Sequence, residues 1–333
     1  MPRPRPELGR RLLYLSRANV ESAGVTMTEV IDAVTLALRE KGEGRVELPP
    51  KPGIHTRPDA FIHAMPAFVP AANAAGLKWI AGYPENLVRY GLPYITGLLI
   101  LNDVETGIPL AVMDATWITA ARTGAVSGVS ARLLARPGSR VLAVFGCGVQ
   151  ARTNLEALAL TVPGLAEVRG YDIVGPNRER FISEGTARYP GLRFVAAETP
   201  QAAADGADIL VTAGPILKSP SPTLRAEWLK EGILGLPVDF DSYWQPEALQ
   251  LCERYYVDDR AQYRYYQGQG YFAGAPEVQG DLGDLLTGKV PGRGSDRERI
   301  VAMNLGLAIE DVVTARLVYD RALERGLGEA LEL

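Results

Sequence analysis

Runs of apolar residues along the chain follow two different patterns. From residue 140 to 290, short apolar runs alternate with stretches of helical period, which is typical of a doubly wound sheet. From residue 61 to 113, apolar runs alternate with turn signals, which predicts a small and largely antiparallel sheet. Two long helical patterns run from Asp114 to Leu134 and from Asp296 to Arg325. We therefore predict an α/β protein with one doubly wound domain and a second domain of sheet and helices.

Shorter signals locate the ends of some elements. Residues 12–16 are predicted to form a strand. Thr26 or Thr28 is expected to cap the helix that follows, and Thr116 or Thr119 is expected to cap part of the 114–134 helical region, because a threonine oxygen can accept a free N–H at a helix start.

One stretch carries a binding motif. Val141 to Phe145 are apolar throughout, as in a strand buried on both faces of a parallel sheet, and Gly146-x-Gly148-x-x-Ala151 follows directly. Gly146 permits a tight turn, Gly148 lets the backbone approach a pyrophosphate, and Ala151 lets the next helix pack closely on the sheet. The N–H groups at the start of that helix suit the anion. The predicted cofactor-binding residues of this stretch are Gly146, Gly148, Val149, Gln150 and Ala151.

The strands that follow extend the prediction. Asp172 ends the second strand, 24 residues after Gly148, near the spacing expected for an acid that binds a ribose 2′-OH; an ordinary turn acid is the alternative. Two apolar residues follow Asp172 rather than an arginine, which favours NAD over NADP. A further buried strand, Asp208 to Gly214, ends in small residues, so Thr212 and Ala213 are expected to lie beside the cofactor.

These elements imply a discontinuous arrangement of domains. The 114–134 helix is expected to carry the chain into the second domain, and the C-terminal helix is expected to return it to the first. We predict a first, discontinuous domain of residues 1–128 and 300–333, and a Rossmann NAD-binding domain of residues 129–299.

Composition narrows the class of function. A net charge of −4 over 333 residues argues against a nucleic-acid-binding surface, and the basic N-terminus with Arg3 and Arg5 is expected to be a solvated tail. No apolar run is long enough for a membrane span, and there is no signal-peptide pattern. Cys147 and Cys252 need no disulfide, which fits the cytoplasm, and two histidines without a cysteine cluster give no reason to expect a metal site.

Three cations are candidates for binding a substrate anion. Lys78 lies in an apolar, strand-like run, where burial of an unpaired ammonium is costly; the residues alone favour a side chain on the polar face. Arg122 is the only charge between Asp114 and Arg132, and it suits either a substrate carboxylate or a structural salt bridge. Lys51 lies in a Pro-rich loop, where a solvated cation is the simpler interpretation.

Two acids follow a strand of the doubly wound domain. Asp239 and Asp241 would share a face if their segment were extended, and close carboxylates raise the pKa of one of them, which suits acid/base catalysis. Asp241 also fits a cap for a helix expected over Tyr243 to Leu249. Asp239 is therefore our first candidate for chemistry.

With these residues assembled, the chain resembles the ornithine cyclodeaminase/mu-crystallin family. The matching stretches cover nearly the whole chain: Met65-Pro66, Gly76 to Trp79, Tyr83-Pro84, Thr106-Gly107, Ala111 to Asp114, Ile118 to Thr123, Gly146 to Ala151, Gln279 to Leu282, and Gly306-x-x-x-Glu-Asp311. The resemblance implies a Rossmann domain, a dimerising domain of sheet and helices, and a nicotinamide cofactor that faces a small amino or imino acid.

The resemblance also implies roles for single residues. Lys78 resembles the family's active-site lysine, and Arg122 resembles the arginine that binds the substrate carboxylate. Lys51 stands where the family has another carboxylate-binding arginine, a departure that loses a bidentate contact. Asp239 matches the acid of the cyclodeaminases, but the surrounding Leu236 to Trp244 departs from their pattern.

We therefore expect an NAD(H)-dependent oxidoreductase that acts at the α-carbon of an amino or imino acid, as an imine reductase or amino-acid dehydrogenase. The expected substrate-binding residues are Lys51, Lys78 and Arg122, and the expected catalytic residues are Lys78 and Asp239. Two alternatives remain: a cyclodeaminase that releases ammonia and recycles its cofactor, and a crystallin-like protein that binds the cofactor without turnover. The expected partners are a small substrate and a second copy of the chain, with neither nucleic acid nor membrane.

Overall fold

The computed structural model describes residues 6–333, so Arg3 and Arg5 of the expected tail lie outside the described residues. The chain forms two compact units. The first contains residues up to Arg122 together with Leu307–Leu333, and the second contains Thr123–Gly306. The predicted fold class, a doubly wound domain with a discontinuous α+β domain, is confirmed.

The first unit is built on a seven-stranded sheet in the order β15-β1-β6-β5-β4-β3-β2. Its neighbouring strands are antiparallel except for β1 and β6, which are parallel. The strands are β1 (Arg11–Leu15), β2 (Gly53–Ile54), β3 (Phe61–Val69), β4 (Ala74–Gly82), β5 (Ile95–Asn102), β6 (Pro109–Asp114) and β15 (Glu329–Glu332).

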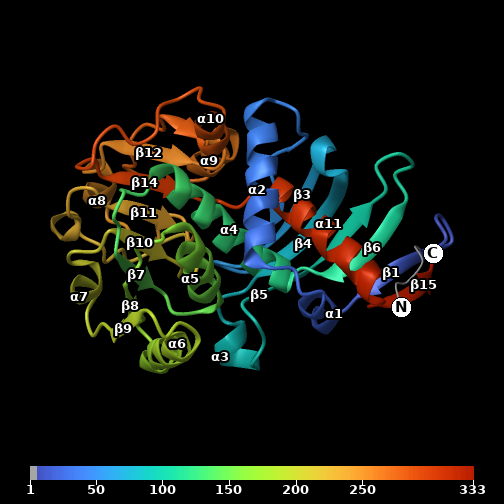
Figure 1. Ribbon diagram of the computed structural model, residues 1–333, viewed down its shortest axis with the longest axis horizontal. Helices are drawn as coiled ribbons and strands as arrows, with labels where there is room; N and C mark the ends of the chain where they lie inside the picture. Colours follow the sequence, from blue (N-terminus) through green and yellow to red (C-terminus); the bar gives the residue numbers. More distant parts are fainter. Residues whose placement is uncertain (1–5) are drawn as a thin grey trace. The chain divides into compact units, whose positions relative to one another are not determined.

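Helices cover one face of this sheet. Helix α11 packs against β3, β4 and α2, as Figure 1 shows in red and blue. Helix α2 begins after Thr26, whose side chain accepts the N–H of Glu29, so one of the two predicted caps is confirmed. The helices are α1 (Arg17–Ser22), α2 (Met27–Gly42), the 3₁₀ turn η1 (Pro70–Ala72), α3 (Asn86–Tyr90), α4 (Thr116–Leu134), which continues into the second unit, and α11 (Ala308–Arg325).

The second unit contains an eight-stranded parallel sheet in the order β13-β12-β14-β11-β10-β7-β8-β9. The strands are β7 (Val141–Phe145), β8 (Glu167–Tyr171), β9 (Arg193–Ala196), β10 (Ile209–Thr212), β11 (Leu234–Pro237), β12 (Arg254–Val257), β13 (Gly280–Asp281) and β14 (Ile300–Met303). The chain moves outward from β7 to β9 and then returns to the other side of β7 with β10. This reversal is the point at which open α/β sheets bind ligands.

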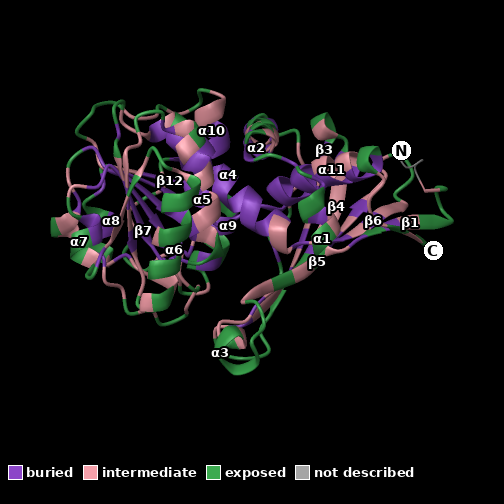
Figure 2. Ribbon diagram, turned by 60° about the horizontal axis from the view of Figure 1, so that its bottom comes forward, coloured by how far each residue is buried: buried purple, intermediate pink, exposed green. Residues whose placement is uncertain are grey.

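Helices connect these strands: α5 (Val149–Thr161), α6 (Gly175–Arg188), α7 (Pro200–Ala204), the 3₁₀ turn η2 (Ala226–Trp228), α8 (Pro246–Gln250), α9 (Arg260–Gln267) and α10 (Leu282–Leu286). Alternate residues of β7 enter two different apolar clusters, Phe145 in one and Val144 in the other. The sheet is therefore covered on both faces, which explains the unbroken apolar run from Val141 to Phe145. Figure 2 shows these buried strands and the exposed outer side of α6.

Three predictions about elements were wrong. The helical pattern that was expected from Asp296 begins only at Ala308, because Ile300–Met303 is a fully buried parallel strand between β11 and β12. A short, wholly apolar run does not distinguish a buried strand from a buried helix. The second unit consequently extends to Gly306, past the predicted boundary at residue 299.

The other two errors concern helix starts. Helix α4 is not capped by a threonine; Asp114 accepts the N–H of Thr116 at 2.9 Å. The helix expected from Tyr243 begins at Pro246, and Asp241 accepts the N–H of Phe272 instead of capping it. Asp114 thus takes the place of the expected threonine at the start of α4, whereas no side chain caps α8, which starts with Pro246 after Gln245.

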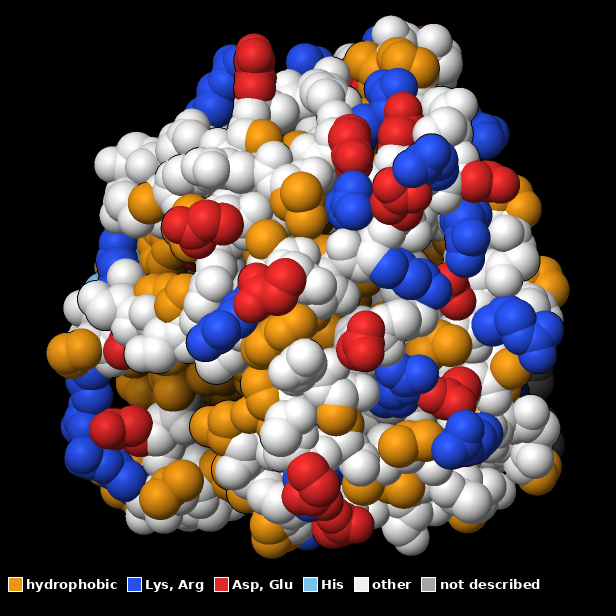
Figure 3. Space-filling view, turned by 90° about the vertical axis from the view of Figure 1, so that its left-hand side faces the viewer, with side chains coloured by type: hydrophobic (Ala, Val, Ile, Leu, Met, Phe, Trp, Pro, Cys, Tyr) orange, Lys and Arg blue, Asp and Glu red, His pale blue; other side chains and the backbone are white. Residues whose placement is uncertain are grey.

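The surface in Figure 3 mixes charges of both signs. Over most of this face, Lys and Arg side chains are interspersed with Asp and Glu. None of the helices within residues 6–333 combines the length and apolar character needed to span a membrane. Cys147 and Cys252 are both buried and free.

Candidate functional site

The glycine turn of the second unit lies where the direction of the sheet reverses. Gly146 has a φ of +87°, and a Cβ on it would lie 2.7 Å from the carbonyl oxygen of Ala213. Only glycine fits this position, because a side chain would meet backbone and the conformation is left-handed. The turns after β7 and β10 are therefore in contact at the carboxyl edge of the sheet, the expected position for a dinucleotide.

Asp172 supports this turn through both carboxylate oxygens. Its Oδ2 accepts the N–H of Cys147 and its Oδ1 accepts the N–H of Val174, each at 2.8 Å. A carboxylate oxygen accepts more than one hydrogen bond, so these contacts leave capacity for a ribose hydroxyl. Arg152 supports the turn from the other side, because its Nη1 donates to the carbonyls of Cys147 and Gly148 at 2.9 and 2.8 Å.

The start of α5 fits a bound anion. Gly148 precedes the helix, no side chain caps it, and a Cβ on Gly148 would meet no described atom within 4 Å. Uncapped N–H groups beside open space suit a pyrophosphate, and Val149 and Gln150 are the first residues of this helix. Val149 and Ile173 are 62% and 78% exposed, which leaves apolar surface beside the turn for a planar ring.

Thr212 and Asp239 form a buried pair in the same unit. The hydroxyl of Thr212 donates to Oδ1 of Asp239 at 2.6 Å, and the N–H of Gly214 donates to Oδ2 at 2.8 Å. Burial raises the pKa of Asp239 to about 7 despite these hydrogen bonds. Trp244 donates its indole N–H to Thr212 at 3.2 Å, so the threonine side chain is held inside the protein. Only the backbone of Thr212, with the half-buried Ala213, remains for contact with a cofactor.

The two acids of this segment do not share a face. Phe240 between them has a φ of +61°, and this left-handed residue turns the chain back on itself. Asp239 therefore faces the end of β10, while Asp241 binds the N–H of Phe272. The condition for a shared face, an extended segment, is not met, because Phe240 is buried among Tyr266, Phe272 and other aromatic rings that fix the turn.

Lys78 lies at the centre of the sheet in the first unit. On β4 it pairs with Met65 of β3 and Leu99 of β5, and its side chain is completely buried. The position on the polar face that the residues alone favoured is therefore wrong. Its Nζ donates to Oδ1 of Asp311 at 2.6 Å. Burial lowers the pKa of Lys78 to about 7, although Asp311 opposes this shift.

Arg122 of α4 joins the same cluster. Its Nε donates to Oδ1 of Asp311 at 3.0 Å, and its Nη1 donates to Oε2 of Glu310 at 3.1 Å. Both acids are inaccessible to solvent, and burial raises the pKa of Glu310. Oε1 of Glu310 and Oδ2 of Asp311 have no hydrogen-bond partner among the described residues. The structure therefore contains a salt bridge at Arg122, one of its two predicted roles.

Lys51 is buried rather than solvated, with 6% of its surface exposed. Burial lowers the pKa of His63 to about 3, and the positive charge of Lys51 adds to this shift and also lowers the pKa of Lys78. The first unit thus brings three cations together: Lys51, Lys78 and Arg122. The acids Glu310 and Asp311 pair with two of them, Arg122 and Lys78.

Three contributors to these groups were missed. The acids Glu310 and Asp311 were part of a matching stretch but received no role, although two adjacent charges in an apolar helix start were a usable signal. Arg152 was overlooked because nothing in a sequence indicates that a helix arginine will fold back onto its own turn.

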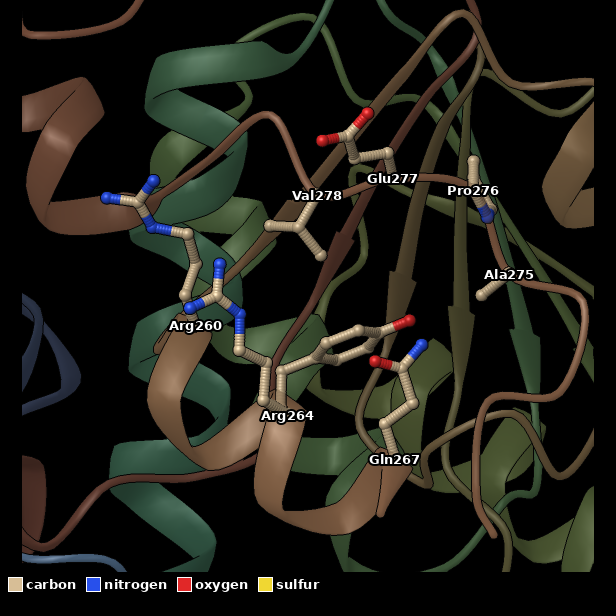
Figure 4. Close-up of a pocket in the computed structure, with 8 residues that line it drawn as sticks. Arg260, Arg264, Gln267, Ala275, Pro276, Glu277 and Val278 are labelled. Atoms are coloured by element: carbon tan, nitrogen blue, oxygen red, sulfur yellow. The ribbon is translucent and has the colours of Figure 1, made fainter.

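A separate cavity of about 200 Å³ lies on the second unit, between α9 and the loop of residues 275–278. Figure 4 shows Arg260 and Arg264 on the helix side and Glu277 on the loop side. None of the predicted site residues lines this cavity. We therefore do not assign it to the candidate site.

Comparison with known proteins connects these groups to a family. Residues 12–326 match the model of the ornithine cyclodeaminase/mu-crystallin family. The chain is 38% identical to the nodulation efficiency protein NfeD from Rhizobium meliloti over 318 residues, which is 95% of this chain and 97% of that protein.

Two solved structures share the whole architecture. A Δ1-pyrroline-2-carboxylate reductase from Thermococcus litoralis, in complex with NADH and L-proline, is 32% identical with a TM-score of 0.86. An archaeal alanine dehydrogenase dimer with bound NAD is 33% identical with a TM-score of 0.85. In both cases the match covers 96% of this chain and 99% of the other. The chain therefore belongs to the ornithine cyclodeaminase/mu-crystallin family.

Proposed function

We propose that this protein is an NAD(H)-dependent oxidoreductase that acts at the α-carbon of a small amino or imino acid. The observation that carries the proposal is the buried pair of cations, Lys78 and Arg122, held on one oxygen of Asp311. The dinucleotide turn of the second unit and the likeness to a pyrroline-carboxylate reductase and an alanine dehydrogenase support it.

The substrate carboxylate is bound by Arg122 and Lys78, with Lys51 nearby. An ammonium has three donors and Lys78 uses one of them on Asp311, so two remain for a ligand. Several donors on one carboxylate fix the orientation of the substrate and therefore of its α-carbon. Because three cations outnumber the two buried acids, the group favours an acid over a neutral amine or alcohol.

Asp239 is our proposed proton-transfer group. A pKa of about 7 lets a carboxyl group hold and release a proton near neutral pH, as general acid/base catalysis requires. In the reductive direction the imine nitrogen gains a proton and the α-carbon gains a hydride, and in the oxidative direction both leave. Lys78, with a pKa also near 7, is the other group able to exchange a proton.

NAD is the proposed cofactor, and when bound it accepts or donates the hydride. Its pyrophosphate would lie at Gly146, Gly148 and the start of α5, and its ribose at Asp172. Arg178, on the helix after Asp172, already binds Glu179, Glu198 and the carbonyl of Ala197. Its existing partners make it a poor receptor for the 2′-phosphate of NADP.

A cofactor assay tests the reaction. NADH would be incubated with pyruvate, glyoxylate or oxaloacetate plus ammonia or methylamine, and with cyclic imino acids, while the reduced-nicotinamide absorbance is followed. We expect net oxidation with at least one substrate, and loss of at least about a hundredfold in turnover in Lys78→Met, with NADH binding retained. Ammonia release from L-ornithine without net cofactor change would instead identify a cyclodeaminase, and binding of NADH without any turnover would favour the non-catalytic alternative.

A homodimer is the proposed assembly. Side chains on the sheet face opposite α11 alternate with Lys78 and are largely apolar, and Trp79 and Leu98, which are paired across β4 and β5, are 46% and 48% exposed. Tyr14 on β1 is 37% exposed. Exposed apolar area of this kind on a sheet face is typical of an interface between subunits, and the archaeal alanine dehydrogenase is a dimer.

A further inference from the structure

Two adjacent acids at the start of α11 have no role in the reaction as described so far. Glu310 and Asp311 follow the apolar residues Ala308 and Ile309, and neither acid is exposed to solvent. Buried carboxylates are costly unless they are paired, so their position calls for a physical reason. Their partners come from two other elements of the same unit: Lys78 from β4 and Arg122 from α4.

We propose that Asp311 is a positioning residue, which holds Lys78 and Arg122 together for one substrate carboxylate and keeps the Lys78 ammonium charged. This inference rests on the proposed function, because it assigns the two cations to the substrate. A single oxygen, Oδ1, accepts from Nζ of Lys78 at 2.6 Å and from Nε of Arg122 at 3.0 Å. The shared oxygen brings the two nitrogens close enough for one carboxylate to reach both.

The charge of Asp311 stabilises the protonated form of Lys78, which has few other favourable interactions. Asp311 is its only hydrogen-bond partner among the described residues. Burial lowers the pKa of Lys78, and the positive charges of Arg122 from α4 and Lys51 from the loop before β2 lower it further. His63 of β3 also lies within electrostatic range. Without Asp311 the ammonium would lose its proton at a lower pH and with it the attraction for an anion.

Glu310 is a suitable comparison for Asp311, because it is an adjacent buried acid that binds Arg122 but not Lys78. It binds Arg122 and the N–H of Leu307 through Oε2, at 3.1 and 3.2 Å, and within residues 6–333 it forms no hydrogen bond or ion pair with Lys78. Removal of its charge should therefore disturb Lys78 much less than removal of the charge on Asp311, although the two acids are adjacent on the same helix.

The protonation of Lys78 can be measured without a substrate. The chain has six lysines, Lys41, Lys51, Lys78, Lys218, Lys230 and Lys289, so incorporation of lysine labelled with ¹³C at the ε-carbon gives few NMR signals, and Lys78→Arg identifies the one of interest. In the full-length protein we expect a midpoint near 7 for the Lys78 signal. In Asp311→Asn it should fall by at least about one pH unit, and in Glu310→Gln by less than about half a unit.

Glu40→Gln is the matched control, because Glu40 also pairs with an arginine of this unit, Arg45 at 2.7 Å, away from Lys78. It should leave the midpoint unchanged. If Asp311→Asn does not fold, Asp311→Ser removes the same charge with a smaller side chain and should give the same shift. A Lys78 midpoint that stays in place in the Asp311 variants would overturn the proposal.

Kinetics add a readout that a merely structural role would not change. With the substrate that the cofactor assay identifies, kcat/KM of Asp311→Asn should be at least about tenfold below the wild type at pH 8 and should recover toward pH 5.5, where Lys78 is charged in both proteins. A smaller loss that remains at pH 5.5 is the expected effect of separating Lys78 from Arg122. An equal loss at both pH values would mean a structural role and would overturn the proposal. A shifted NMR midpoint with no turnover of any substrate would leave the positioning role standing and refute the proposed reaction instead.

Discussion

Lys78 and Asp239 are buried ionisable residues whose pKa values move toward 7 from opposite sides, because burial disfavours the charged form of each. Neither shift is visible in the sequence, where Lys78 is one polar residue in an apolar run and Asp239 is a strand-end acid. Their partners are distant in sequence: Asp311 lies 233 positions from Lys78, and Thr212 lies 27 positions from Asp239. The sequence could therefore suggest the residue types of the candidate site but not the contacts that set their charge.

The raised pKa of Asp239 predicts a pH dependence of stability. The folded-state pKa of about 7 lies above the ordinary value of 3.8, so folding favours the protonated form. The resulting stability is fully present below pH 3.8 and is lost as the pH rises through 7. Between pH 5 and 8, the free energy of unfolding of the wild type should fall by about 2–3 kcal/mol relative to Asp239→Asn, as measured by chemical denaturation.

Glu227→Gln is the control for this measurement, since Glu227 is on the exposed turn η2, with 63% of its side chain accessible. Its difference from the wild type should be the same at both pH values. Parallel pH profiles for the wild type and Asp239→Asn would contradict a raised pKa at this position.

Among elements, those with a repeated or motif-bearing pattern could be predicted, and those defined by their neighbours could not. The strand–turn–helix around Gly146 follows from local sequence, because a left-handed residue and a close backbone approach require glycine. Strand β14 could not be recognised, because its apolar residues are explained only by insertion between β11 and β12. The turn at Phe240 was missed for a similar reason, since aromatic neighbours rather than local sequence stabilise its left-handed backbone.

A substitution in the glycine turn tests whether this element binds the cofactor. A methyl group on Gly148 meets no described atom within 4 Å, and its φ is −85°, so Gly148→Ala should fold with an unchanged melting temperature. The same methyl group would occupy the space assigned to the pyrophosphate, so affinity for NADH, measured by fluorescence titration, should fall at least about tenfold. Gly191→Ala, also in open space, is the control and should bind NADH normally. Wild-type affinity in Gly148→Ala would remove this turn from the cofactor site.

At the scale of the whole molecule, the seven-stranded sheet of the first unit has two different faces. One face holds Lys78 against α11, and the other exposes Trp79 and Leu98. If that outer face pairs two subunits, Leu98→Glu should convert a dimer into a monomer, because burial of a charge in an apolar interface is costly. Light scattering after size-exclusion chromatography measures the mass. Leu160→Glu, on α5 and similarly exposed at 51%, should remain dimeric; a dimeric Leu98→Glu would place the interface elsewhere.

In the proposed reaction, a hydride moves between the nicotinamide and the α-carbon of an amino acid whose carboxylate binds Arg122 and Lys78. The most direct measurement uses NADH deuterated at C4 on the transferred face, together with the imino or keto acid that the cofactor assay identifies, and mass spectrometry of the product. We expect one deuterium at the α-carbon of the amino acid formed. Oxidation of the labelled cofactor with no deuterium at that carbon would contradict it.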